Sequence, residues 1–146
     1  MYLLRGFLIW LVIIFAESVH GTVRQLFLAP AVGDFTARRI AFFSGMLLIF
    51  LITWLLIGWS RATTTRSLLA IGGMWAVLTL AFEFGIGFLV LGYTSERVFE
   101  DYDISRGGLM AFGIVFMALV PYLAAWLKGI KQRHDADGAR RYAGRP

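Results

Sequence analysis

Three side chains that can exchange a proton or bind an ion follow an apolar run near the start of the chain. The run GFLIWLVIIFA, residues 6–16, leads directly into Glu17, His20 and Arg24. Their spacing of i, i+3 and i+7 places them on one face of an α-helix. An ionised side chain in a hydrocarbon layer is costly unless it is paired or hydrated. This face is therefore expected to point into the protein.

Glu83 is a second acidic residue, and it stands alone in a long apolar run. No other charge occurs between positions 67 and 95. It continues a helical stripe of small residues, Gly72, Ala76 and Thr79. Small residues let helices approach closely, so the stripe is expected to face the first helix. At about 1.5 Å per residue from the predicted helix starts, Glu17 and Glu83 reach a similar depth.

We therefore predict one buried polar site between the first and third helices, which binds a ligand or a proton. Its expected members are Glu17, His20, Arg24 and Glu83. Two copies of a short motif flank it, DFTARR at 34–39 and DYDISR at 101–106. Arg39 and Arg106 are expected to cover the site from outside. Asp34 and Asp101 would hold these arginines or cap the following helices.

Three interpretations of this site remain open at the level of sequence. It can be a structural network in which Arg24 pairs with a carboxylate and fixes the helix register. It can be a proton or small-ligand site, because an imidazole such as that of His20 can gain or lose a proton. The third interpretation is a metal site, since Glu-x-x-His is the ligand spacing of di-iron bundles. Only one such motif is present and an arginine lies beside it, so we predict no metal ion and no cofactor.

The elements that hold these residues are long apolar helices. The chain is 59% hydrophobic and only 16% charged, whereas a soluble domain carries about 25% charged residues. A membrane-spanning helix needs about 20 apolar residues. The fold class predicted is therefore an all-α integral membrane protein, a bundle of four transmembrane helices. Their expected ranges are 3–29, 36–59, 67–94 and 106–127.

Self-similarity within the chain indicates two tandem helical hairpins, residues 1–66 and 67–128. WLVIIFAE at 10–17 aligns with WAVLTLAFE at 75–83, and both segments end in a glutamate. Two hairpins of the same orientation form a parallel repeat, related by an axis along the membrane normal. Residues 129–146 are predicted to be a basic, disordered tail.

Basic residues beside the spans predict the orientation. The tail is rich in lysine and arginine, the turn SRATTTRS at 60–67 carries two arginines and no acid, and the loop at 93–108 is net acidic. Both termini are therefore expected in the cytoplasm. The first helix is expected to be retained, because Glu17 would fall inside a signal-peptide cleavage motif. The predicted location is a bacterial cytoplasmic (inner) membrane.

The sequence limits the function classes more than it identifies a function. The net charge is +5, but its basic excess lies mostly in the tail, so no nucleic-acid partner is predicted. The chain contains no cysteine, which excludes thiol chemistry. No Ser/His/Asp arrangement or nucleotide fingerprint is recognised, so enzymatic activity is left uncertain and disfavoured.

The expected function is proton-coupled transport or binding of a small solute at the polar site. The alternative is a non-catalytic subunit or assembly factor of a membrane complex, with the polar network as its structural core. The expected partners are membrane lipid and either a second copy of the chain or a membrane partner subunit.

Overall fold

The computed structural model of the chain describes residues 1–90, 92, 94–96, 103 and 108–130, and its regular elements are helices. They are α1 (Tyr2–Val23), the π-helical turn η1 (Arg24–Leu28), α2 (Ala29–Val32), α3 (Asp34–Ser60), α4 (Thr65–Gly85), the π-helical turn η2 (Ile86–Val90) and α6 (Met110–Leu127). α1, η1 and α2 form one continuous helix, and η2 extends α4. Four helices are thus long and apolar enough to cross a membrane.

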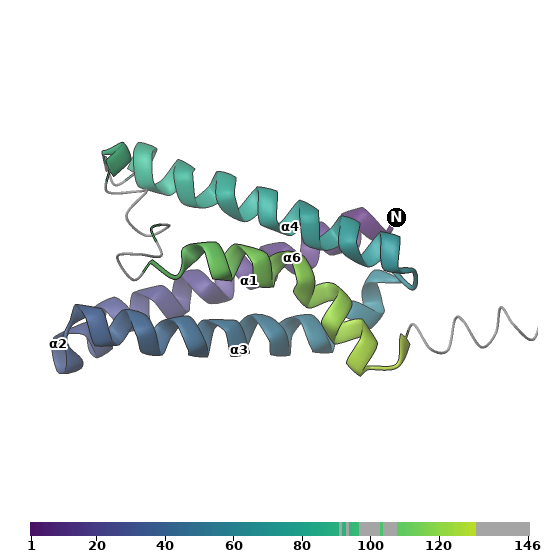
Figure 1. Cartoon of the computed structure of the whole chain (residues 1–146), viewed down its shortest axis with the longest axis horizontal. Helices are drawn as coiled ribbons and strands as arrows, with labels where there is room; N and C mark the ends of the chain where they lie inside the picture. The colour runs from purple at the N-terminus through teal and green to yellow at the C-terminus, as the bar shows by residue number, and fades with distance from the viewer. Residues whose placement is uncertain (91, 93, 97–102, 104–107, 131–146) are drawn as a thin grey trace, which may run out of the picture.

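The helices pack as a bundle in which each has two main neighbours. α1 packs against α3 and α4, and α6 packs against the same two helices. The order around the bundle is therefore α1, α3, α6, α4. In Figure 1 α4 runs along one side of the bundle and separates from α1 and α3 toward the left-hand end.

One end of the bundle carries basic side chains that bond to the last carbonyls of α3. Arg5 Nη1 donates to Trp59 O at 3.0 Å, and its guanidinium lies 5.3 Å from the Trp59 ring centre. Lys128 Nζ donates to the carbonyls of Trp54 (2.8 Å) and Leu55 (3.2 Å). Trp59 lies in the last turn of α3, so its carbonyl has no i+4 donor in the helix and Arg5 satisfies it, whereas the Lys128 bonds add to the helix's own hydrogen bonds. We call this end, which also holds Arg61 and Arg66, the basic end.

The opposite end is built around the turn at Gly33. Gly33 has φ 84°, a conformation that a glycine adopts without steric cost, and it lets α3 reverse along α1. Pro30 lies just before this turn and has no N–H, so the carbonyl of Leu26 lacks its usual helical donor. The helix forms a π turn here, in which Ala29 N–H donates to Arg24 O. We call this the Gly33 end.

The apolar core lies in the half of the bundle nearer the basic end. Its buried residues come from all four helices and the turn after α3: Ile9, Trp10, Ile13, Ile57, Ala62, Leu68, Ile71, Trp75, Met117, Val120, Ala124 and Ala125. Two tryptophans join α1 to α4 here. Trp75 Nε1 donates to Gly6 O at 2.8 Å, and Trp10 Nε1 donates to Thr79 Oγ1 at 3.0 Å. Both indole donors are therefore satisfied inside an apolar core.

The predicted all-helical fold with four span-length helices is confirmed, whereas the predicted repeat is not. A twofold axis that exchanges Trp10 with Trp75 would also exchange Thr79 with Ile14. Since Trp10 bonds to Thr79, such an axis would place Trp75 beside Ile14. Trp75 instead bonds to Gly6, so the two contacts are not twofold equivalents. Gly72 was expected to face α1, but a Cβ there would overlap the Ala118 carbonyl oxygen of α6. α4 thus uses this glycine to approach α6.

Candidate polar site on α1 and α3

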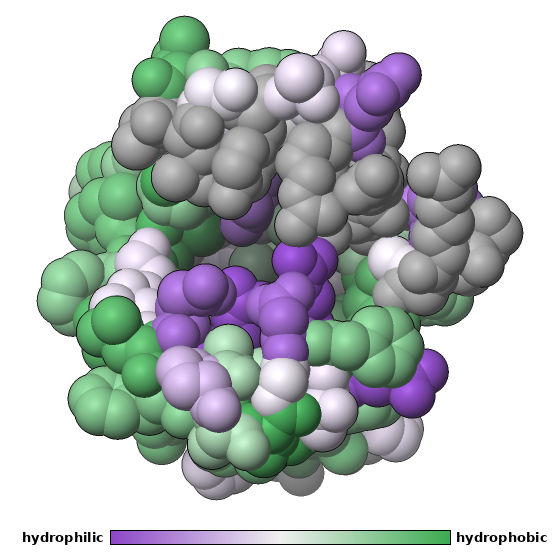
Figure 2. Space-filling view, turned by 90° about the vertical axis from the view of Figure 1, so that its left-hand side faces the viewer, coloured by the Kyte–Doolittle hydropathy of each residue, from purple (hydrophilic) through white to green (hydrophobic). Residues whose placement is uncertain are grey.

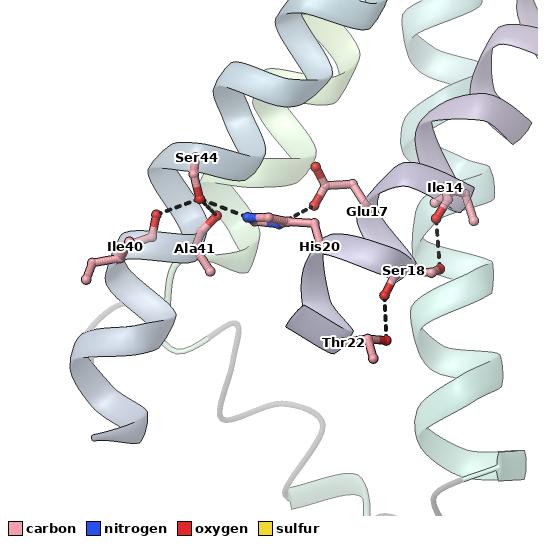
Figure 3. Close-up of polar contacts among 8 residues, drawn as sticks. All are labelled: Ile14, Glu17, Ser18, His20, Thr22, Ile40, Ala41 and Ser44. Atoms are coloured by element: carbon pink, nitrogen blue, oxygen red, sulfur yellow. Dashed lines mark hydrogen bonds and ion pairs between the residues drawn. The ribbon is translucent and has the colours of Figure 1, made fainter. Parts of the chain in front are cut away.

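Glu17 and His20 of α1 turn toward α3 in the half of the bundle nearer the Gly33 end. His20 Nε2 lies 2.8 Å from Ser44 Oγ, and His20 Nδ1 lies 3.4 Å from Glu17 Oε2. Figure 3 shows the imidazole between the carboxylate on its own helix and the serine on the neighbouring one. The two nitrogens of one ring therefore connect Glu17 to Ser44.

Gly45 provides the space that the carboxylate occupies. A Cβ at this position would lie 3.0 Å from Glu17 Oε2 and 3.5 Å from His20 Cε1. Carbon atoms rarely approach an oxygen so closely, so even an alanine would push the carboxylate aside. The adjacent residues Ser44 and Gly45 thus act together, the first as a hydrogen-bond partner and the second as a notch.

A proton lies between His20 Nδ1 and Glu17 Oε2 in either arrangement of the Ser44 hydroxyl. If Ser44 Oγ donates to the carbonyl oxygen of Ile40, 3.0 Å away on its own helix, as helical serines commonly do, it accepts from His20 Nε2–H, and Nδ1 and the carboxylate share a proton. If Ser44 Oγ donates to Nε2 instead, Nδ1–H donates to Glu17 Oε2.

The pair is half-buried, which corrects the expectation of a buried site. About a quarter of each side chain is exposed, 24% for His20 and 27% for Glu17. Glu17 Oε1, in contrast, is buried and has no hydrogen-bond partner among the residues that the structure describes. One carboxyl oxygen, Oε2, thus contacts the imidazole, while the other, Oε1, accepts no hydrogen bond from a described residue.

The other two predicted members, Arg24 and Glu83, take no part in the hydrogen bond and ion pair that His20 makes with Ser44 and Glu17. Arg24 borders an open groove of about 250 Å³ together with His20, Val23, Phe27 and Leu28. Glu83 is exposed on α4, and the ion pairs recorded among described residues do not link it to His20 or Arg24. The partner helix of Glu17 and His20 is therefore α3, whereas the sequence led us to expect the helix of Glu83. α1 meets α4 nearer the basic end, through Trp10 and Thr79.

The expected supporting residues are partly accounted for at the Gly33 end. Asp34 accepts from Arg38 Nε at 2.8 Å rather than from Arg39, and it makes no side-chain cap at the start of α3. The Arg39 guanidinium lies 4.8 Å from the centre of the Phe35 ring. Asp101 and Arg106 fall outside the described residues. Figure 2 views this end and shows hydrophilic side chains gathered near its middle, beside a hollow.

Glu17, His20 and Ser44 contact one another in the sequence Glu–His–Ser, as in a catalytic triad. The surroundings of Ser44 nevertheless favour proton binding over nucleophilic attack. Ser44 lies in the interior of α3, where the backbone N–H groups are bonded within the helix. Acyl transfer needs free donors for the developing oxyanion, and the interior of a helix supplies none. The described residues also contain no group of three His, Asp or Glu side chains that could hold a metal ion.

Ser44 and Gly45 were not identified from the sequence as parts of the site, although a signal was present. Gly33 is the turn of an antiparallel hairpin, so residues equally far from it along the two helices lie at similar depth. His20 precedes Gly33 by 13 positions and Ser44 follows it by 11. A serine and a glycine at that depth in an apolar helix were therefore the natural partners to test.

The fold and the site together define a class of protein, a four-helix bundle with span-length helices and a Glu–His–Ser contact between two of them. No family model matches the chain, and comparisons with curated proteins and with solved structures find no match. The geometry of the site is therefore the basis for the functional proposal.

Proposed function

We propose that the chain is an integral protein of a bacterial cytoplasmic membrane, with both termini in the cytoplasm. The four span-length helices support insertion. Large apolar side chains, among them Phe15, Phe43 and Leu89, are exposed around the bundle, as lipid-facing positions require. Arg5, Arg61, Arg66 and Lys128 share the basic end, and basic residues favour the cytoplasmic side.

We propose that Glu17 and His20 hold one exchangeable proton and couple it to the binding or movement of a small solute. The observation that carries this proposal is the His20 ring, which contacts Glu17 with one nitrogen and Ser44 with the other. Loss or gain of this proton changes the net charge of the pair, and a change of charge inside a membrane is costly unless water or a partner compensates it. Partial exposure of both side chains gives the proton a route to water.

A structural role is the second candidate, and the same contact favours it. The His20–Ser44 hydrogen bond joins α1 to α3, so the cluster can specify how the first hairpin closes. The chain would then be a non-catalytic subunit or assembly factor of a membrane complex. Because four helices enclose little volume, we propose under either function that the chain associates with a second copy or with a partner subunit.

Infrared difference spectroscopy on the full chain in lipid nanodiscs, recorded against pH, tests the proton site. The wild-type protein is expected to show a carboxyl C=O band that appears on protonation and shifts in D₂O. Glu17→Gln removes the band, and His20→Gln moves it because the carboxyl loses its partner. Ser18→Ala is the matched control, since Ser18 is the next residue and bonds to Ile14 O of its own helix.

Thermal unfolding of the same samples separates the two candidates. A proton site predicts that Glu17→Gln loses the band while its melting temperature stays near that of wild type. A structural core predicts a large drop in melting temperature and in yield for Glu17→Gln and Ser44→Ala together. A carboxyl band that does not titrate in the wild-type protein would exclude the proton site.

A further inference from the structure

Arg24, the first residue of η1, takes part in no ion pair among the residues that the structure describes. The ion pairs of the described residues join His20 to Glu17 and Arg38 to Asp34. A guanidinium stays charged at all physiological pH values. Within a membrane-spanning helix it needs an anion or water.

The position of Arg24 makes escape to the membrane surface difficult. It precedes the end of α2 at Val32 by eight residues, which is about 12 Å along a helix. Each Cα–Cβ bond of a helix tilts toward its N-terminus, so the side chain leaves the backbone in the direction away from the Gly33 end. A partner for the guanidinium must therefore come to it.

The groove beside Arg24 combines one charge with apolar walls. Val23, Phe27 and Leu28 supply the apolar lining, and His20 supplies the second polar group. Its volume of about 250 Å³ is below the range of about 300–1,000 Å³ typical of sites for drug-sized ligands. The dimensions and chemistry fit a short hydrocarbon chain that ends in an anionic group.

We propose that this groove binds a small monocarboxylate, with its carboxylate on Arg24 and its hydrocarbon part on Val23, Phe27 and Leu28. A planar guanidinium matches a carboxylate with two parallel hydrogen bonds. His20 borders the same groove and connects it to the proton held with Glu17. The inference rests on the proposed function for coupling to a proton, whereas binding of the acid follows from Arg24 and the groove.

Equilibrium dialysis of radiolabelled butyrate against the full chain in nanodiscs tests the assignment. Binding is expected to saturate, and Arg24→Gln should weaken it about tenfold or more, because a charge-assisted hydrogen bond is lost. Arg24→Lys keeps the charge without the paired geometry and should fall between the two. Arg66→Gln is the control, since it removes the same charge at the basic end.

Two competitors and one further variant make each outcome decisive. Butyramide has the same size without the charge and should not displace butyrate from the wild-type protein; displacement would overturn the carboxylate assignment. If oleate binds through Arg24 and butyrate does not, the ligand is a membrane fatty acid and the small-solute assignment is wrong.

Glu17→Gln should lose the titrating carboxyl band and still bind butyrate. Equal butyrate affinities of wild type, Arg24→Gln and Arg24→Lys would refute this inference and leave the proton site standing.

Discussion

The two halves of the bundle differ in how their helices meet. In the basic half, residues from all four helices form one buried core, and tryptophans bond across α1 and α4. In the Gly33 half, residues 14–52 and 80–116, the buried residues among those described are Ala37, Gly45 and Gly87. The first half is tightly packed and apolar, whereas the second is loosely packed and holds the polar side chains.

This difference assigns separate tasks to the two halves. A dry, close-packed core tolerates few changes in volume, so the basic half supplies the stability that holds the bundle together. Ionisable groups need water or a partner, which the looser Gly33 half provides to Glu17, His20 and Arg24. Substitutions in the basic half should therefore lower stability, and substitutions in the Gly33 half should change protonation and binding.

The largest effect is expected at the contact between α4 and α6. A Cβ at Gly72 would overlap the Ala118 carbonyl oxygen, so Gly72→Ala must force two backbones apart and should cost about 3 kcal/mol. The adjacent Gly73 has open space around its Cβ position, so Gly73→Ala should gain about 0.5–1 kcal/mol of helix propensity. Reversible unfolding of both variants in mixed micelles measures the free energies. Equal effects of the two variants would show that α4 and α6 are not in close contact.

An intermediate effect is expected at the notch in the Gly33 half. Gly45→Ala should displace the Glu17 carboxylate and shift its infrared band, at a stability cost of about 1 kcal/mol. In a Glu17→Ala background, Gly45→Ala should not lower the free energy of unfolding further, because the carboxylate is no longer there to be displaced. The double-mutant cycle should therefore give a coupling energy of about 1 kcal/mol.

Gly113→Ala provides the matched control for this cycle. A Cβ at Gly113 would meet only Phe42, at an ordinary 3.8 Å, so its effect should add to that of Glu17→Ala without coupling. Additive effects for Gly45→Ala as well would place the carboxylate away from α3.

The smallest effect is expected at Thr53, and the buried Thr79 of the same half serves as its comparison. Thr53 Oγ1 is buried without a hydrogen-bond partner among the described residues, so Thr53→Val should be neutral or should stabilise by up to about 1 kcal/mol. Thr79 accepts from Trp10, so Thr79→Val should leave that donor unsatisfied and destabilise by about 1–2 kcal/mol. The same unfolding measurement compares them. A loss at position 53 as large as that at position 79 would reveal a polar partner in the core.

The sequence predicted most of the fold because four apolar runs of span length have few alternative structures. It also predicted that Glu17 and His20 act together, since residues at i and i+3 share a helix face. It misassigned the partner helix because small residues mark close packing without naming the neighbour. Gly72 indeed marks a close approach, but that approach is to α6 rather than to α1.

The sequence alone determined the local chemistry of the chain: four apolar helices, a Glu–His pair one turn apart, and a short loop between positions 29 and 36 that joins the first two helices. Only the tertiary structure decided that this pair faces Ser44 and Gly45 of α3. The physical reason is that helix periodicity fixes which side chains share a face. Which neighbour that face meets depends on how all four helices pack, and here the tryptophan core at the basic end sets their order.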